Sequence, residues 1–393
     1  MGRALTLTLA LVTLAGCSAP VASPPASTSA PATSAPATGS PSGPRTAPDG
    51  RPFVVEELDE FDEPWAMAFL PGGELLVTDR GGILRLREVD GRTVEIGGVP
   101  KVVHDGQGGL GDVIASPGFA SDRTVYLSWV EPGEGGTGAV VGRARLAGTS
   151  DAPELTGLRV IWRQQPKTSG SGHFGHRLAF SPDGAYLFVS SGERQKFDPA
   201  QDLGTNLGKT LRLNPDGSPA AGNPWAEQGG VTAEVWTRGH RNPLGLAFDP
   251  AGNLWSTEMG PQGGDELNLI EAGRNYGWPK ASNGSHYSGG AIPDHRDGDG
   301  FAAPTAFWNP SISPGSLMVY TGDAFPQWQG HAFIGALSGK ALVRVDLSGT
   351  TATEGDTWEM GQRIREVEQA PDGSIWLLED TPGGRLLRLA PPS

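Results

Sequence analysis

The sequence predicts an all-β fold, and three observations support that prediction. First, the 393 residues include 59 glycines and 34 prolines, which interrupt helices and favour turns between strands. Second, one hairpin motif recurs along the chain. Third, apolar and polar residues alternate after each copy, with the period of a half-buried strand. Together they indicate an array of β-hairpins.

Each copy of the hairpin motif has an apolar pair, a Pro-x-Gly turn and an alternating apolar strand. Proline presets φ for the turn, and glycine accepts a positive φ. Such repetition is typical of sheets arranged radially. The four clearest copies are AFLPGGELLVTD (68–79), AFSPDGAYLFVSSG (179–192), AFDPAGNLWSTEMG (247–260) and EQAPDGSIWLLED (368–380).

The length of the folded region indicates how many sheets the array contains. About 340 residues divided into six leave roughly 57 for each sheet, which is enough for four strands and their loops. We therefore predict a six-bladed β-propeller, although seven smaller blades would also fit. GGILRLRE (81–88) resembles GGRLLRLA (383–390), so we expect the two chain ends to close one blade together.

The N-terminus predicts export and a lipid anchor. Residues 1–17 contain an apolar run that is too short to cross a membrane and is typical of a secretory signal peptide. They end in LAGC, which resembles the lipobox of bacterial lipoproteins and would make Cys17 the lipidated residue; an ordinary signal peptide is the alternative. Residues 18–50, almost all Ser, Ala, Pro and Thr, predict a disordered tether. We expect one folded domain at 51–393, lipid-anchored to the bacterial cell membrane on its extracytoplasmic side.

The charge of the chain excludes some classes of partner. There are 44 acidic and 30 basic residues, a formal net charge of −14, so no basic surface is expected for nucleic acid. An anionic ligand would need a locally basic pocket. Cys17 is the only cysteine, so no disulfide within the chain stabilises the fold.

Two motifs suggest sites that their surroundings do not support. GQGGLG (106–111) has the letters of a dinucleotide-binding loop, but Pro117 and Gly118 follow too soon for the helix that such a loop opens. DHRDGDG (294–300) suggests a calcium loop, but two positions that need acids hold His295 and Ala306. We interpret it as a solvated acidic loop.

Several other loops carry residues suited to chemistry. In TSGSGHFGHRLAF (168–180), His173 and His176 stand three residues apart; they could be metal ligands, a catalytic base beside a bystander, or structural residues. Further loops present Gln107 between glycines, the segment HRN (240–242) before a proline, and a Gly-Pro-x-Gly-Gly turn (260–264) with free carbonyls. Arg363 and Arg365 would share one face of a strand. Each feature taken alone is more often structural than functional. The order in which the features follow one another along the chain is a more specific indication of function.

That order resembles the glucose/sorbosone dehydrogenase family, particularly its soluble aldose sugar dehydrogenases. The specific segments are GHRNPLGLAFDP (239–250) and GPQGGDELNLIEAGRNYGWP (260–279), and the resemblance extends from Trp65 to Leu389. It implies a six-bladed β-propeller that binds pyrroloquinoline quinone (PQQ) and Ca²⁺ and oxidises the anomeric carbon of aldose sugars to lactones. Electrons would pass to a membrane quinone or a cytochrome.

The resemblance also implies roles for individual residues. His173 matches the catalytic base, and the main-chain carbonyls of Gly260 and Pro261 match ligands of the calcium at the cofactor. Glu266 and Tyr276 match a further calcium site. Cofactor contacts are implied for Gln107, Arg241, Asn242, Tyr287, Ser311, Lys340, Arg363 and Arg365.

The chemistry of these residues agrees with the implied roles. PQQ carries three carboxylates, which arginine can pair in bidentate fashion. Calcium prefers oxygen ligands and would polarise a quinone carbonyl. A neutral imidazole at His173 could remove the proton of the anomeric hydroxyl while a hydride passes to the quinone.

The sequence departs from the family at a few places near these residues. Gly172 stands where an acid is usual, Met259 replaces a polar residue, and Glu193 stands where aspartate is common. The family's lysine aligns with Ser338, so either Lys340 takes its role or one carboxylate contact is lost. His176 stands where relatives usually have glycine, and we interpret it as a bystander.

Two alternatives remain from the sequence. One is a non-catalytic cell-surface propeller that binds a carbohydrate or a protein partner. The other is a calcium-dependent lactonase, which would need a cluster of carboxylates on the axis.

Overall fold

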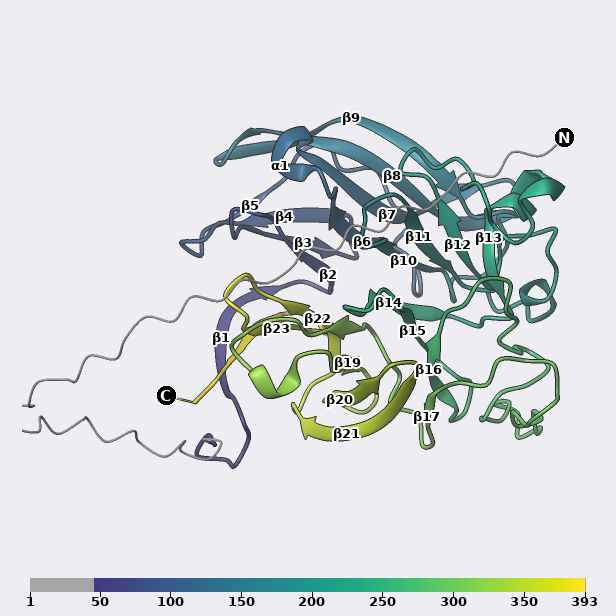
Figure 1. Ribbon diagram of the computed structural model, residues 1–393. Helices are drawn as coiled ribbons and strands as arrows, with labels where there is room; N and C mark the ends of the chain where they lie inside the picture. Colours follow the sequence, from purple (N-terminus) through teal and green to yellow (C-terminus); the bar gives the residue numbers. More distant parts are fainter. Residues whose placement is uncertain (1–45, 393) are drawn as a thin grey trace, which may run out of the picture. The chain divides into compact units, whose positions relative to one another are not determined.

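The structure is a computed structural model that describes residues 46–392. The predicted signal peptide, Cys17 and nearly all of the tether lie outside the described residues. Within 46–392, six antiparallel sheets of four strands each form a ring (Figure 1). The prediction of a six-bladed β-propeller is therefore confirmed.

The blades follow one another along the chain, and we number them from the first complete one. Blade 1 contains β2 (Pro64–Phe69), β3 (Leu75–Asp79), β4 (Ile83–Arg87) and β5 (Thr93–Glu95). Blade 2 contains β6 (Leu110–Ala115), β7 (Thr124–Gly133), β8 (Gly136–Thr149) and β9 (Ala152–Arg163). Blade 3 contains β10 (Gly175–Phe180), β11 (Leu187–Ser191), β12 (Lys209–Leu213) and β13 (Val235–Arg238). Blade 4 contains β14 (Pro243–Phe248), β15 (Leu254–Glu258), β16 (Asp265–Leu269) and β17 (Ala306–Trp308). Blade 5 contains β18 (Met318–Val319), β19 (Ala332–Ala336), β20 (Ala341–Ser348) and β21 (Thr351–Glu359). Blade 6 contains β22 (Ile364–Gln369), β23 (Ile375–Glu379), β24 (Gly384–Ala390) and β1 (Val54–Phe61).

Helical segments of the described chain are short and lie in loops: α1 (Phe119–Asp122), η1 (Asp198–Ala200), η2 (Ala226–Gln228), η3 (Gly230–Glu234) and η4 (Pro326–Trp328). Between residues 46 and 392, no helix is long and apolar enough to cross a membrane.

The four hairpin motifs are the first two strands of blades 1, 3, 4 and 6. In each turn, the main-chain N–H of the glycine donates to the carbonyl three residues earlier. The φ of these glycines is positive, at 94°, 69°, 88° and 79° for Gly73, Gly184, Gly252 and Gly373. The Pro-x-Gly pattern therefore predicted the turns for the right physical reason.

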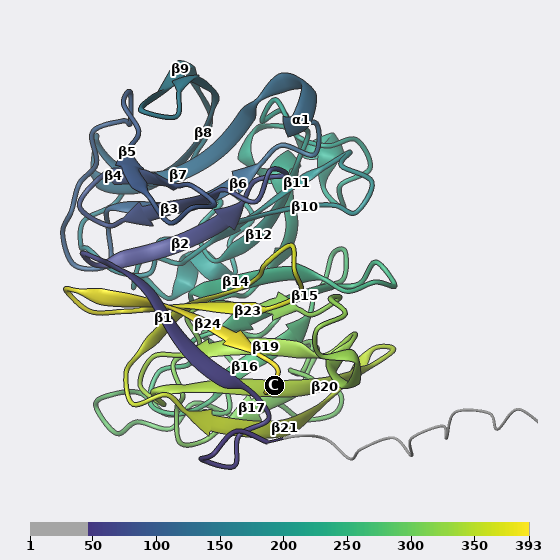
Figure 2. The same ribbon diagram turned by 90° about the vertical axis from the view of Figure 1, so that its left-hand side faces the viewer.

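The two ends of the chain close blade 6 together, as the sequence predicted, but with a different N-terminal strand. β1 pairs antiparallel with β24, from Val54 opposite Ala390 to Phe61 opposite Gly384 (Figures 1 and 2). Residues 81–88 instead contain β4 of blade 1. Their likeness to 383–390 arises because β4 and β24 are both third strands of their blades.

A hydrophobic cluster fills each of the six interfaces between neighbouring blades in the described ring. Sheets that pack face to face bury both of their faces, so β3, β11 and β15 are buried at every residue and are not half-buried as the alternation predicted. The ring is closed, since β22 contacts β2. In ring order, the cluster pairs include Leu76 with Leu127, Val130 with Val189, Phe188 with Leu254, Trp255 with Val343, Phe333 with Leu377, and Leu378 with Val77.

Candidate active site

Two adjoining cavities bring the predicted site residues together. The first, which we call the axial cavity, has a volume of about 320 Å³ and receives residues from all six blades or the loops that enter them: Trp65, Gln107, His176, Leu244, Ser313 and Arg365. The second, which we call the aromatic cavity, has a volume of about 240 Å³ and is lined by His173, Phe197, Arg241, Pro261, Trp278 and Tyr287, among others. The consecutive residues Arg241 and Asn242 line one cavity each, so the two lie side by side.

His173 lies in the aromatic cavity against a buried carboxylate. Its Nδ1 is 2.5 Å from Oε1 of Glu193, and the two side chains are 8% and 1% exposed. Oε2 of Glu193 accepts the main-chain N–H groups of Lys196 and Phe197. A carboxylate that accepts on both oxygens requires a proton on Nδ1 of His173, which leaves Nε2 without one. Glu193, which stands where the family commonly has aspartate, is thus the acid that orients His173, whereas Gly172 supplies none.

Burial lowers the pKa of His173 below its ordinary value, and the charge of Arg241 acts in the same direction, whereas Glu193 raises it. The imidazole is therefore neutral at neutral pH and can accept a proton on Nε2. Its backbone φ is 52°, in the left-handed region that non-glycine residues rarely adopt. Strained backbone of this kind is common at functional sites.

Two amide side chains hold the loop that carries His173. Oε1 of Gln107 accepts the main-chain N–H of His173 at 2.7 Å, and Oδ1 of Asn242 accepts that of Gly175 at 3.1 Å. Both residues also line the axial cavity. Neither NH₂ group donates to any residue of 46–392, so both remain available to a ligand.

Arginines make one side of the axial cavity basic. Arg363 and Arg365 each donate two hydrogen bonds to the carboxylate of Asp380, one arginine to each oxygen. Arg80 lies on the same cavity and donates to the carbonyls of Gly106 and Gly108. Arg80 also lies 3.9 Å from a carboxylate oxygen of Glu63, so three guanidinium groups face two carboxylates and leave a local positive charge in an acidic protein, as an anionic ligand requires.

Arg241 links the aromatic cavity to the turn that follows β15. It donates from Nη1 to the carbonyl of Met259 at 3.0 Å and from Nη2 to the hydroxyl of Tyr287 at 3.4 Å. Its Nε is buried without a hydrogen-bond partner among the described residues. Tyr287 is 74% exposed, so its ring lies at the mouth of the cavity.

The turn at 260–264 gathers main-chain oxygens. The N–H of Gly260 donates to Oδ1 of Asp265, whereas neither carbonyl of Gly260 and Pro261 accepts a hydrogen bond from any residue in 46–392. A Cβ at Gly260 would lie 2.3 Å from the carbonyl oxygens of Gly263 and Gly264. Only glycine fits there, and the oxygens around it are the ligand type that calcium prefers.

Glu266 lies beside this turn in a small cavity of about 10 Å³, together with Glu258 and Tyr276. Burial raises the pKa of Glu266 to about 8, and the neighbouring charge of Glu258 adds to the shift. Two buried carboxylates fit a hard cation. The Tyr276 hydroxyl donates to the carbonyl of Leu269, so only its main-chain oxygen is available as a ligand.

Two predicted cofactor contacts do not line either cavity. The Ser311 hydroxyl donates to Asp265, and Ser313 lines the axial cavity in its place. Lys340 is exposed beyond a turn in which its N–H donates to Leu337, and the Ser338 hydroxyl donates to that of Ser313. Neither Lys340 nor Ser338 supplies a positive charge to the cavity, whereas Arg80 does.

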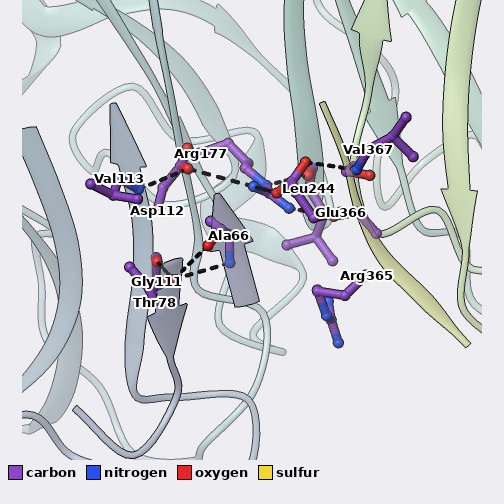
Figure 3. A network of polar contacts seen from close by, with 12 residues as sticks. Ala66, Thr78, Gly111, Asp112, Val113, Arg177, Leu244, Arg365, Glu366 and Val367 are labelled. Carbon is purple, nitrogen blue, oxygen red and sulfur yellow. Dashed lines mark hydrogen bonds and ion pairs between the residues drawn. The ribbon is translucent and has the colours of Figure 1, made fainter. Parts of the chain in front are cut away.

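Carboxylates do lie on the inner strands below the axial cavity, but an arginine occupies the space between them. Figure 3 shows Arg177 between Asp112 and Glu366. Its Nε and Nη2 donate to the carbonyls of Leu244 and Gly315 at 2.7 Å. Among residues 46–392 there is no group of three or more His, Cys, Asp or Glu side chains that could hold a metal. The arrangement does not support the metal-dependent lactonase.

Sequence reasoning missed three residues of the site. Asp380 could have been predicted, because it is the acid that ends the motif WLLED and a hairpin places it opposite Arg363 and Arg365. Arg80 follows the equivalent strand of blade 1, β3, which makes its position at the same end of the ring predictable from the repeat. Glu193 was noted only as a departure, although an acid after β11 lies at that end too.

Comparisons with known proteins agree with this geometry. The glucose/sorbosone dehydrogenase family matches residues 61–388. Aldose sugar dehydrogenase YliI of Escherichia coli (strain K12) is 42% identical over 342 residues, which cover 85% of this chain and 91% of that protein.

Two solved structures extend the comparison. The crystal structure of the soluble aldose sugar dehydrogenase from Escherichia coli in the apo-form has a TM-score of 0.82 at 41% identity and covers 86% of this chain and 100% of that one. The structure of the PQQ-bound form of aldose sugar dehydrogenase from Streptomyces coelicolor has a TM-score of 0.72 at 31% identity, covering 86% and 98%. This chain belongs to the glucose/sorbosone dehydrogenase family.

Proposed function

We propose that the protein oxidises the anomeric carbon of aldose sugars to lactones, with PQQ and calcium as cofactors. The observation that carries the proposal is the neutral His173, fixed by Glu193, in a cavity next to one lined by three arginines. A relative with 31% identity is described as PQQ-bound, which supports the same cofactor here.

The residues present fit the cofactors. Arg80, Arg363 and Arg365 would pair carboxylates of PQQ. The Gly260 and Pro261 carbonyls would ligate the calcium at the cofactor. Bound PQQ would supply a two-electron acceptor, and the calcium a Lewis acid.

The side chains of the aromatic cavity would bind and deprotonate the sugar. Trp278 and Phe197 stack with 5.6 Å between ring centroids and give the cavity an apolar wall suited to the C–H face of a sugar ring. Nε2 of His173 would take the proton of the anomeric hydroxyl. Glu193 would keep the imidazole oriented and stabilise the imidazolium that forms.

A second calcium would lie between Glu266, Glu258 and the main-chain oxygen of Tyr276, where it would neutralise the two buried carboxylates. We further propose a lipid anchor at Cys17 on the extracytoplasmic side of the membrane, and a membrane quinone or a cytochrome as the electron acceptor. Nucleic acid is not a proposed partner, because the net charge is −14.

Reconstitution tests the proposal. The apo-protein, given PQQ and Ca²⁺, should develop a bound-cofactor spectrum and reduce an artificial dye when aldoses are added. His173→Ala should lower kcat by roughly 10²- to 10⁴-fold, the usual contribution of a general base, without loss of cofactor binding. His331→Ala, directly before β19 of blade 5 and outside both cavities, is the matched control.

Two results would contradict the proposal. Absence of both the spectrum and dye reduction with every aldose tried would favour the non-catalytic propeller that binds a carbohydrate or a protein. Unchanged turnover in His173→Ala would remove this residue as the base.

A further inference from the structure

His176, which the sequence suggested was a bystander, lies in the lining of the axial cavity. Its ring stacks on that of Trp65, with 5.0 Å between centroids and 11° between planes. The ring also lies against Gly111, where an added Cβ would be 2.0 Å from Cε1 of His176, and edge-on to the ring of Phe174, with 6.4 Å between centroids. The ring is therefore held by its surroundings on more than one side.

A serine fixes which nitrogen of His176 carries the proton. The Ser128 hydroxyl oxygen accepts the main-chain N–H of Asp112 at 2.7 Å and lies 2.8 Å from Nδ1 of His176. The hydroxyl has one hydrogen, and Nδ1 is its only acceptor in the described part of the chain. Ser128 therefore donates to Nδ1, and the proton of the neutral imidazole is on Nε2.

The imidazole remains neutral over the working pH range. Burial, followed by the charges of Arg177 and Arg194, lowers the pKa of His176 to about 3. Nε2 makes no hydrogen bond to any residue of 46–392, and it is not among the enclosed polar atoms that lack a partner. Since the residue lines the axial cavity, Nε2 reaches the open space of that cavity.

We propose that His176 is a further cofactor-binding residue, whose Nε2–H donates a hydrogen bond to an acceptor atom of the planar, acceptor-rich anion held in the axial cavity. This rests on the proposed function, in which that anion is PQQ. The arginines of the cavity come from blades 1 and 6, whereas His176 belongs to β10 of blade 3. A donor from blade 3 would orient a flat ligand that guanidinium groups contact from another side.

Two substitutions at His176 distinguish the contribution of its Nε2–H group from that of the packing of its ring. His176→Phe keeps an aromatic ring against Trp65 but removes the N–H. His176→Gln loses the ring but can place an amide N–H near the position of Nε2. His331→Phe makes the same change directly before β19 of blade 5, outside the axial cavity, and serves as control.

The experiment titrates each apo-protein with PQQ at saturating Ca²⁺ and follows the quenching of tryptophan fluorescence. His176→Phe should raise the Kd for PQQ about tenfold, the effect of one hydrogen bond to a ligand, and His176→Gln should stay within about threefold of the parent. Equal weakening by Phe and Gln would show a packing role and overturn the proposal, as would unchanged binding in His176→Phe. A parent protein that binds no PQQ would overturn the proposed function first.

A second measurement does not depend on the variants folding. In the parent protein with ¹⁵N-labelled histidine, the NMR spectrum should show the Nε2–H tautomer of His176, and its proton should shift when PQQ is added. An Nδ1–H tautomer, or an Nε2–H signal that PQQ does not move, would contradict the proposal.

Discussion

Replacing Glu193 with glutamine tests how much the buried carboxylate contributes to catalysis. The amide keeps the shape but loses the charge that holds the proton on Nδ1 of His173. Hydrogen bonds to charged groups contribute about 1.5–3 kcal/mol, and the low exposure of both side chains, 8% and 1%, places this one at the upper end. About 3 kcal/mol corresponds to a roughly 150-fold lower kcat, at 1.36 kcal/mol for each factor of ten.

The assay is steady-state dye reduction with saturating aldose, PQQ and Ca²⁺, measured across pH. Because Glu193 raises the pKa of His173, the acid limb of the variant's kcat profile should move to lower pH. Glu234→Gln is the matched control, since Glu234 is another hydrogen-bonded carboxylate, accepting from the Trp162 and Asn206 side chains, but lines neither cavity. A kcat within about threefold of the parent, with an unmoved acid limb, would refute the reasoning.

Three further predictions concern the base, the turn and the second calcium. In the parent enzyme kcat should be constant through neutral pH and fall only below the ordinary pKa of histidine, because burial lowers the pKa of His173; a fall that begins above neutrality would contradict this. Gly260→Ala should abolish activity and weaken calcium binding at least tenfold by calorimetry, because its Cβ would lie 2.3 Å from two carbonyl oxygens. Calcium at about 100 times its Kd should raise the Tm of the apo-protein by roughly 4 °C, and Glu266→Gln should remove most of that rise in scanning calorimetry, with Glu234→Gln as control.

The fold could be predicted from the sequence because its main signals are local. A Pro-x-Gly turn between two apolar stretches specifies a hairpin within about twelve residues, and four copies of that hairpin are enough to infer a ring of blades. The closing strand was harder to predict, because half of the residues of β1, VVEELDEF, are acidic and the strand is recognised only by its partner β24. That pairing joins residues more than 300 positions apart.

A site residue could be predicted from the sequence where its position in the repeated blade alone determines where its side chain lies. Arg363 and Arg365 share a strand face, and structure and sequence agree on their common direction. Glu193 reaches His173 from a loop twenty residues away, and the contact depends on how that loop folds back, which composition and spacing do not encode. The role that we propose for His176, in place of a bystander, likewise depends on contacts with Ser128 and Trp65 from other blades, which spacing does not encode.

The pairing of β1 with β24 places the two ends of the folded region next to each other, with Val54 opposite Ala390. Ends that meet in one sheet can be joined by a short linker, and the chain can then be opened between two other blades without loss of any strand pairing. The propeller should therefore accept circular permutation. New termini in the loop between β5 and β6 would leave every blade made from a continuous stretch of chain, and the new ends could carry a surface tether or an electrode contact at a chosen point around the ring.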